Sequence, residues 1–433
     1  MSLMTATRML RIITVAAGAG LALTAAALLW RTNVPDIALP HVSPAEVVPA
    51  PVLERARDYA RFLRIDWLLA VAAQLVALGA VAWRAPALAS RLRGGRVVRG
   101  LQLLLVTLAV QWLIGLPFAA AAHWWRRRYD VTRLGYLDWL VAPWLDLVAG
   151  AVLACVALVI AMTLAVRLGR RWWIAGAPVL AALGAVSVLA APLLLTPRFQ
   201  PLRDRALAAE IERLGAIVGV RGIEVRVQRV HDRTRRANAT LEGVGPTRRL
   251  VLWDTLLDGR FTRREVRFIA AHELAHAGRH HLWKGLAWLA LLTPLLTLAI
   301  AEGTRLRGGM SEPAAVPLAV LVAVALQLAL LPVTNAISRR YEQEADWTAI
   351  EATRDPDAAR RFFRRLPRTN LADPEPPLWA RVVLGTHPSL VARIALAEAW
   401  KRQESVSTLR RGRRAADRAS TLAAWTTRRS SPG

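Results

Sequence analysis

Two histidines and a glutamate, arranged as HExxH, are the residues of this chain best suited to chemistry. His272 and His276 are four positions apart in AHELAH, so on an α-helix both imidazoles project from one face with the separation that one metal ion needs. Glu273 lies between them, where its carboxylate can take a proton from a zinc-bound water. The motif predicts a catalytic zinc site, and two ordinary interfacial histidines are the alternative. His280 and His281 follow and are expected to cap the membrane interface, with binding of a second ion as the alternative.

The segment that carries these residues has the start signals of a helix. Thr262 and Glu265 match the T-x-x-E capping box, in which the two ends of the first turn satisfy each other's backbone N–H groups. Phe261 and Val266 stand at the positions of a hydrophobic staple. These four residues predict a helix that begins just after Thr262 and presents the HExxH residues on its later turns.

A catalytic zinc keeps three protein ligands and one open position, so one more ligand is required. Glu342 and Asp346 are one helical turn apart in SRRYEQEADW, which lets Glu342 bind the metal while Asp346 orients a ligand histidine. His276 lies just before one apolar run and Glu342 just after the next. If those runs form a helical hairpin, both motifs emerge at the same face of the membrane. An acidic pair on a solvated helix face is the alternative.

The composition indicates a membrane protein. Of the 433 residues, 55% are hydrophobic, which is too high a share for a chain whose whole surface meets water. The formal net charge of +27 also occurs in nucleic-acid-binding proteins, but here the basic residues are spread through loops between apolar runs. Contact with anionic lipid headgroups explains that distribution, so we expect a lipid bilayer and no nucleic acid as partner. Cys155 is the single cysteine, which excludes an intramolecular disulfide.

Seven apolar runs approach the length of about 20 residues that crosses a bilayer as a helix. The predicted fold class is therefore a mainly α-helical polytopic membrane protein with about seven transmembrane helices. A cleaved signal peptide is the alternative for the first run. Basic residues flank both sides of the loops, so the positive-inside rule leaves the orientation open. The runs lie at about 12–30, 66–83, 101–122, 139–166, 173–195, 282–301 and 314–336.

Polarity divides the chain into three predicted regions. Residues 1–195 form an N-terminal membrane region with the first five runs, and residues 196–400 form a metallopeptidase region that includes the last two. Residues 401–433 are basic and are predicted to be a disordered tail.

The polar stretch at 196–281 predicts a small α/β catalytic region that packs on the membrane helices. Residues 203–217 have the pattern of an amphipathic helix, and IEVRVQRV at 223–230 alternates like a half-exposed strand. ANATL and RLVLW predict two further strands. The GVGPT segment between them supplies Gly and Pro for a reversal, so we expect a β-hairpin with one strand left at an edge.

Beyond HExxH, the sequence resembles the type I CAAX prenyl endopeptidases, a family of integral-membrane zinc metallopeptidases. The resemblance covers most of the chain. It departs from the family pattern at Thr240, where an aromatic residue is common, and at Ala275, where Gly is common. The matching segments are TPRFQPL at 196–202, RRANATLEGVGPTRRLVLWDTLL at 235–257, AHELAH at 271–276, SRRYEQEAD at 338–346 and THPSLVARI at 386–394.

The resemblance implies specific site residues. His387 and Arg393 would face the reacting carbonyl, where a cation or hydrogen-bond donor stabilises the developing oxyanion. Asn238 and Ala239 would lie on an edge strand that holds the substrate backbone by β-augmentation; an ordinary hairpin strand is the alternative. For the metal centre, the resemblance implies one Zn²⁺ ion with His272, His276 and Glu342 as ligands, Glu273 as the base and Asp346 as the partner of a ligand histidine.

The predicted function is zinc-dependent hydrolysis of peptide bonds at a membrane. The resemblance implies CAAX-box protein processing, on substrates that carry a lipid at the C-terminus. The Arg- and Ala-rich composition indicates a bacterial genome, so we expect a multi-pass protein of the bacterial cell membrane with a cytoplasmic catalytic face. A membrane-protein quality-control peptidase and a zinc-containing sensor without turnover are the alternatives; the nearly lone Asp146 within the fourth run disfavours a transporter.

Overall fold

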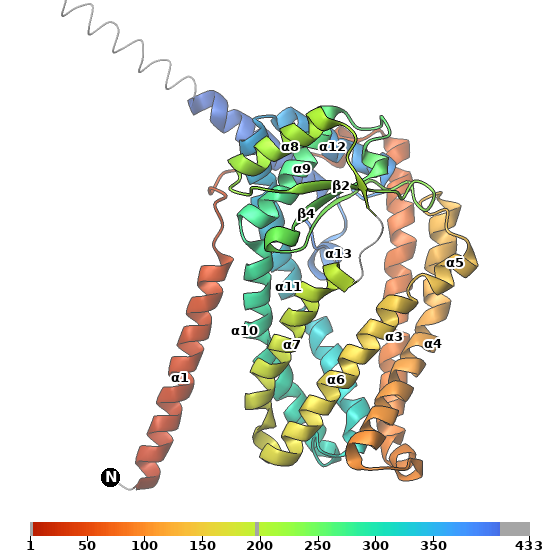
Figure 1. Cartoon of the computed structure of the whole chain (residues 1–433), viewed down its shortest axis with the longest axis vertical. Coiled ribbons are helices and arrows are strands. Elements are labelled where there is room, and N and C mark those ends of the chain that lie inside the picture. Colours follow the sequence, from red (N-terminus) through yellow and green to blue (C-terminus); the bar gives the residue numbers. More distant parts are fainter. Residues whose placement is uncertain (1–2, 195–198, 408–433) are drawn as a thin grey trace, which may run out of the picture.

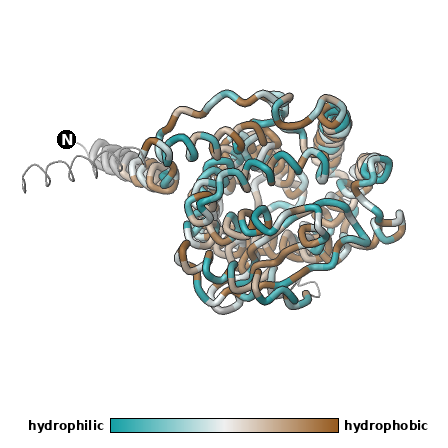
Figure 2. Tube along the Cα trace, turned by 90° about the horizontal axis from the view of Figure 1, so that it is seen from above, coloured by the Kyte–Doolittle hydropathy of each residue, from teal (hydrophilic) through white to brown (hydrophobic). Residues whose placement is uncertain are grey.

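The computed structural model describes residues 3–194 and 199–407. Long helices form an elongated bundle, and a small sheet with short helices covers one end of it (Figure 1). The first helix lies along one side of the bundle (Figures 1 and 2), and its C-terminal end, at Leu29 and Trp30, contacts the bundle through Tyr341 and Arg340. The mainly α-helical architecture with a small α/β region agrees with the predicted fold class.

Most of each predicted apolar run lies in one long helix, although the fourth run, 139–166, begins in the short helix before it, and residue 195 of the fifth run lies outside the described residues. Within the described residues, length and composition identify five segments able to cross a membrane, of which Tyr136–Pro192 contains two predicted runs, and Ala17–Trp30 is a shorter apolar helix. The number of spans therefore stays a prediction. The long helices are α1 (Leu3–Trp30), α3 (Ala50–Arg91), α4 (Arg96–Arg128), α6 (Trp144–Leu168), α7 (Trp172–Leu194), α10 (His281–Gly303) and α11 (Val316–Thr353), with short α2 (Pro44–Val47) and α5 (Tyr136–Val141) between them.

The helices expose apolar side chains along much of their length. Leu69, Trp83, Leu113 and Val152 are among the large hydrophobic side chains left at the surface of the bundle. Exposed apolar surface on this scale is unfavourable in water and suits a lipid environment. The turn between α6 and α7 depends on Gly169, whose φ of 56° closes the end of α6 in a conformation that costs glycine little.

A four-stranded sheet lies above the bundle in the order β1-β2-β4-β3. The predicted hairpin is confirmed, because β3 (Ala239–Glu242) and β4 (Arg249–Trp253) pair antiparallel. Gly243 has a φ of 77°, and a Cβ there would collide with the Thr247 carbonyl. The parallel pairing of β2 (Glu224–Gln228) with β4 was not predicted, and antiparallel β1 (Gln200–Pro201) completes the sheet. Strand β3 is an edge strand of the described sheet.

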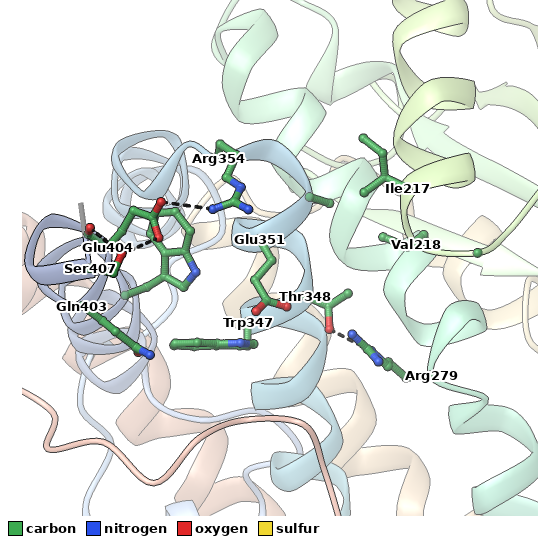
Figure 3. Close-up of a pocket in the computed structure, with 13 residues that line it drawn as sticks. Ile217, Val218, Arg279, Trp347, Thr348, Glu351, Arg354, Gln403, Glu404 and Ser407 are labelled. Carbon is green, nitrogen blue, oxygen red and sulfur yellow. Dashed lines mark hydrogen bonds and ion pairs between the residues drawn. The ribbon is translucent and has the colours of Figure 1, made fainter. Parts of the chain in front are cut away.

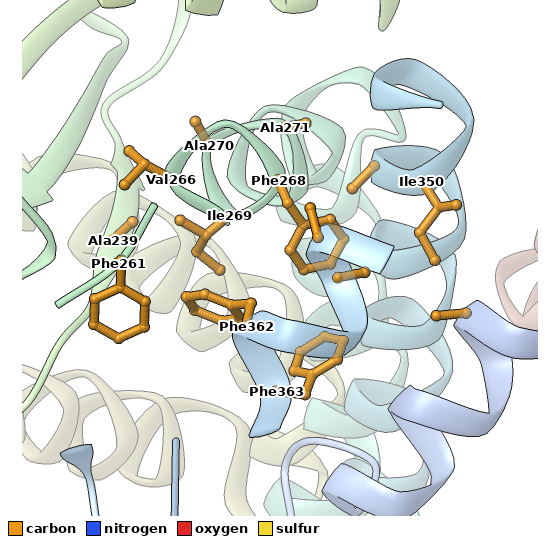
Figure 4. Packing of buried hydrophobic residues seen from close by; sticks show 14 of the residues in the cluster. Ala239, Phe261, Val266, Phe268, Ile269, Ala270, Ala271, Ile350, Phe362 and Phe363 are labelled. Atoms are coloured by element: carbon orange, nitrogen blue, oxygen red, sulfur yellow. The ribbon is translucent and has the colours of Figure 1, made fainter. Parts of the chain in front are cut away.

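The hydrophobic core beneath the sheet is built around α9 (Arg263–Gly278) (Figure 4). Phe268 is fully buried, with its ring centroid 5.4 Å from that of Phe363 and 5.9 Å from that of Phe362. Both partners come from α12 (Pro356–Thr369). Amphipathic α8 (Arg205–Ile217) packs on α9 as well, burying Ile211 in the same cluster. One face of α9 is thus fixed by aromatic and aliphatic packing, while the other is available for chemistry.

The predicted capping box of α9 is confirmed. Thr262 Oγ1 accepts a hydrogen bond from the Glu265 N–H, and the Glu265 carboxylate accepts one from the Thr262 N–H at 2.7 Å. Glu265 is fully buried, but its charge is compensated because Arg365 Nε donates to both carboxylate oxygens at 2.9 and 3.0 Å. The start of the helix is therefore fixed by its own first turn and by α12.

After α12, the chain passes α13 (Leu378–Val383) and returns to the core in a final helix over residues 390–407. Residues 401–407, the first part of the predicted tail, continue this helix. The other tail residues, 408–433, lie outside the described residues.

Candidate metal centre

Helix α9 aims its two motif histidines at one point. The Nε2 atoms of His272 and His276 lie 3.2 Å apart, and the rings meet edge to face with centroids 4.9 Å apart. Their four-residue spacing on an unbroken helix produces this convergence. Two imidazole nitrogens therefore face the same small volume.

Helix α11 supplies the third group. Glu342 Oε2 lies 3.3 Å from His272 Nε2, and Glu342 Oε1 lies 3.5 Å from His276 Nε2. Potential ligand atoms of these three residues all lie within 4.8 Å of one another. The expected meeting of the two motifs at one face of the α10–α11 hairpin thus agrees with the structure.

The donor set fits a metal ion. Glu342 Oε2 is buried and receives no hydrogen bond from the described part of the chain, an arrangement that costs free energy unless a cation or donor compensates it. Two imidazoles and one carboxylate are a ligand set of catalytic zinc sites, which leave a further position open. His272, His276 and Glu342 are therefore the residues that would hold the ion.

Asp346 lies behind His272, one turn beyond Glu342 on α11. Asp346 Oδ1 is 2.9 Å from His272 Nδ1, so a carboxylate faces the imidazole on the side opposite to Glu342. Such a carboxylate partner fixes the orientation of a ligand histidine. The predicted position of Asp346 beside a ligand histidine thus matches the geometry.

Burial governs the protonation of the α9 residues. Burial raises the pKa of Glu273 to about 7, with the Glu342 charge acting in the same direction and His272 opposing it. Burial, together with neighbouring His272, lowers the pKa of His276 to about 3. A neutral His276 keeps a lone pair for a metal, and a carboxylate that titrates near neutrality suits a general base.

His387, assigned only by resemblance, also reaches the site. Its Nε2 lies 3.3 Å from Glu342 Oε2, its Nδ1 lies 2.9 Å from Thr386 Oγ1, and its side chain is 55% exposed. Partial desolvation by the surrounding chain, with the positive charge of Arg393, lowers the pKa of His387, and the Glu342 carboxylate opposes that shift. An accessible imidazole at the rim can therefore meet a bound substrate.

Arg393 takes a different position from His387. Its side chain is buried and donates to both oxygens of Asp346, while its Nη2 is 3.9 Å from Glu342 Oε2. The guanidinium also lies over the ring of Phe363, 4.3 Å from the centroid. Arg393 thus contributes positive charge to the site while holding Asp346 in place.

Asn238 and Ala239 lie at the start of edge strand β3, which packs against α9. Asn238 lines a cavity of about 310 Å³ together with His272, Glu273, His387 and Arg393. Ala239 begins β3 and is buried. A second cavity of about 290 Å³, lined by Leu241, Trp283, His276 and again Glu273, lies further along β3. Both cavities share Glu273.

A larger cavity, of about 720 Å³, lies away from these residues. It is lined by Arg279, Trp347, Thr348 and Glu351 among others, and by none of the metal-binding triad (Figure 3). Arg279 Nε donates to Thr348 Oγ1 across it. Size alone therefore does not mark the candidate active site.

The sequence interpretation missed two residues beside the site. His281 was expected at the membrane interface, but it is buried with its Nδ1 2.8 Å from His276 Nδ1. Its Nε2 meets buried Glu344 at 3.0 Å. Glu344 stands between Glu342 and Asp346 in the sequence. This alternation of acidic residues is the sequence feature that could have pointed to Glu344.

Comparison with known proteins gives consistent results. Residues 201–401 match the model of Peptidase family M48. The chain is 29% identical over 242 residues to a Bacillus subtilis (strain 168) protein described as "Uncharacterized metalloprotease YhfN", with 53% of this chain and 57% of that protein covered. It is 26% identical over 239 residues to "CAAX prenyl protease 1 homolog" of Oryza sativa subsp. japonica, with 52% and 55% covered.

The matches therefore span little more than half the length of these curated relatives. Among solved structures, the crystal structure of S. mikatae Ste24p has the same fold, with a TM-score of 0.66, 19% sequence identity, and coverage of 85% of this chain and 92% of that one. Together these matches confirm the predicted resemblance and support a membrane metalloprotease.

Proposed function

The chain is a relative of peptidase family M48 that resembles the type I CAAX prenyl endopeptidases, and on this premise we propose that it is a zinc-dependent endopeptidase of the membrane. The observation that carries the proposal is the convergence of His272, His276 and Glu342 within 4.8 Å, with Glu273 beside them. A structural zinc site has no use for a base next to an open position, which favours an enzyme over a sensor.

A zinc ion held by the three residues would polarise the scissile carbonyl and lower the pKa of the attacking water. Glu273 takes the proton from that water and later delivers it to the nitrogen of the leaving amine. Its pKa of about 7, raised by burial, suits both transfers at neutral pH because neither protonation state is strongly favoured.

His387 donates to the substrate carbonyl oxygen as negative charge develops there. Its exposed side chain and the position of its Nε2 beside Glu342, in the cavity that Glu273 also lines, support this role. Arg393 assists by its positive charge and by holding Asp346. A preoriented donor of this kind is commonly worth about 10²–10³-fold in rate.

The substrate is a peptide that binds in extended form along β3. The outer edge of this strand is unpaired in the described sheet. The backbone of Leu241, on the same strand, lies close to the Glu273 carboxyl group. An added strand would place its backbone across Glu273 between the two cavities, as in β-augmentation. Asn238 and Ala239 would hold the end of this peptide that enters the cavity lined by His387.

The resemblance further supports a substrate that carries a lipid near its C-terminus, as in CAAX-box processing. We place the protein in the bacterial cell membrane with the catalytic end in the cytoplasm. Both proposals rest on the family resemblance and the composition, and they extend the central proposal of metal-dependent peptide hydrolysis.

The test uses purified full-length protein with zinc and two substrates. One is a farnesylated CAAX peptide, and the other is an unmodified fragment of a membrane protein. Cleavage of the farnesylated peptide alone supports processing of lipid-modified substrates, whereas cleavage of the fragment alone supports quality control. The Glu273→Gln variant is the control, and cleavage of neither substrate by the wild-type protein would contradict the proposed activity.

A further inference from the structure

A sharp corner between α9 and α10 brings His281 back onto the metal centre. The corner is made by His280, which adopts the left-handed conformation with φ 57° and ψ 33°, an uncommon one for a residue with a side chain. Because α10 begins at once with His281, its ring is turned toward the HExxH face of α9. His281 is 7% exposed, so it does not serve as an interfacial cap.

Both nitrogens of the His281 ring have partners. Nδ1 is 2.8 Å from His276 Nδ1, and Nε2 is 3.0 Å from Glu344 Oε2. The ring also stacks on Tyr341, with centroids 4.8 Å apart and an interplanar angle of 13°. The imidazole is therefore held in one orientation between a metal-binding candidate and a carboxylate.

The two facing Nδ1 atoms can share only one proton. His276 presents Nε2 to the metal-binding triad, so that nitrogen must be unprotonated for binding and Nδ1 must carry the hydrogen. His276 Nδ1–H then donates to His281 Nδ1. In consequence His281 carries its own hydrogen on Nε2 and donates it to Glu344, which is the arrangement that the carboxylate stabilises.

Glu344 is itself fixed by the surrounding chain. Its Oε1 accepts a hydrogen bond from the Asn33 N–H at 3.0 Å, and its Oε2 accepts one from Lys284 Nζ at 3.2 Å. The side chain is 3% exposed. A buried carboxylate with this set of donors keeps its charge and its position.

Asn33 belongs to the segment that follows α1, and two further contacts tie the end of that helix to α11. Tyr341 Oη donates to the Leu29 carbonyl at 2.7 Å, and Arg340 Nε donates to the Trp30 carbonyl at 3.2 Å. The three α11 residues in these contacts lie within one turn or so of Glu342. The end of α1 is therefore part of the support of the metal centre.

We propose that His281 and Glu344 are positioning residues that fix the tautomer and orientation of His276 for metal binding. The ligand histidines then have separate carboxylate supports from α11: Asp346 acts directly on His272, and Glu344 acts on His276 through His281. The inference rests on the metal centre of the proposed function. It does not depend on which bond, if any, the protein cleaves.

The experiment measures zinc affinity of the purified full-length protein by competition with a chromophoric chelator, without peptide. His281→Phe keeps an aromatic ring to stack on Tyr341 but removes both nitrogens, and Glu344→Gln keeps the shape but removes the charge. We expect each to weaken zinc binding by about 10- to 100-fold, as loss of the partners of ligand histidines does. Glu302→Gln, at an exposed ion pair with Arg305 at the far end of α10, should bind zinc like the wild type.

A double variant separates positioning from general support of the fold. Because the two residues act in series, His281→Phe with Glu344→Gln should lose little more affinity than the weaker-binding single variant, whereas independent structural effects would add. The absorption spectrum of the Co²⁺-substituted protein should change in all three variants, since it reports ligand geometry. Wild-type zinc affinity and an unchanged cobalt spectrum in His281→Phe would overturn the inference. Should that variant not fold, Glu344→Gln alone decides by the same two measurements.

Discussion

The guanidinium of Arg393 binds both carboxylate oxygens of Asp346, with Nε–Oδ2 and Nη2–Oδ1 distances of 2.6 Å. Both side chains are buried, so water cannot solvate one charge when the other is removed.

We therefore predict that Arg393→Met lowers the free energy of unfolding by about 3–5 kcal/mol, because it leaves the buried charge of Asp346 uncompensated. Thermal unfolding in detergent provides the measurement. The double variant Arg393→Met with Asp346→Asn should recover much of the stability without recovering activity. Equal losses of stability in the single and double variants would contradict this explanation.

Glu273→Gln should separate metal binding from turnover. The amide retains the size of the carboxylate but cannot accept the proton from water, so we expect normal zinc content and a loss of kcat of about 10²–10⁴-fold. Metal analysis and peptide cleavage are measured on the same preparation. Substantial activity in this variant would rule out Glu273 as the base.

Glu342→Ala should lower the zinc content below one ion per chain. The variant removes the one carboxylate of the triad and leaves two imidazoles, which are too few ligands for a tight site. Glu351→Ala is the matched control, since Glu351 is an exposed acid on the same helix. If both variants retain full zinc after dialysis against a mild chelator, the third ligand must be another residue.

Removal of the metal should abolish cleavage reversibly. Treatment with 1,10-phenanthroline should stop hydrolysis of the peptide substrate, and added zinc should restore it, because the site residues alone offer no strong electrophile for the carbonyl. The fold should persist, since the hydrophobic core around Phe268 and α12 does not include the metal. Undiminished cleavage in the metal-free protein would be incompatible with the mechanism.

His387→Ala should lower kcat more than it changes KM. His387 is proposed to donate to the carbonyl oxygen only as negative charge develops, so its loss affects the transition state more than substrate binding. We expect a decrease of about 10²–10³-fold in kcat. His231→Ala, at an exposed histidine paired with Asp254, serves as the control. A rise in KM alone would assign His387 to substrate binding.

Local signals in the sequence predicted much of the region around the candidate metal centre. The capping box of Thr262 and Glu265 fixes its own helix start, and the GVGPT turn fixes its own hairpin, so both follow from neighbouring residues. The joining of His276 with Glu342 required only that two consecutive apolar runs return through the same membrane. Each of these features depends on short sequence separations or on a simple topological rule.

Features that depend on distant packing were not predictable in the same way. The parallel pairing of β2 with β4 requires β3 to be placed outside β4, and no local pattern specifies that order. The contact between His281 and Glu344 depends on the left-handed conformation of His280 and on a residue in α11. Asn33, which binds the same carboxylate, is still further away in the chain, and its contribution comes from a backbone N–H that has no sequence signature.

If substrates pair with the open edge of β3, as proposed, that edge determines what kind of selectivity this protein has. A partner that pairs with β3 presents its main chain, which every amino acid shares, so the first discrimination acts on conformation more than on side-chain identity. A helix or folded domain must first unfold locally to pair with the strand, and the free energy of that unfolding weakens binding. Extended segments at chain ends and in loops therefore compete best, and the local stability of a target protein determines its susceptibility as much as its sequence does.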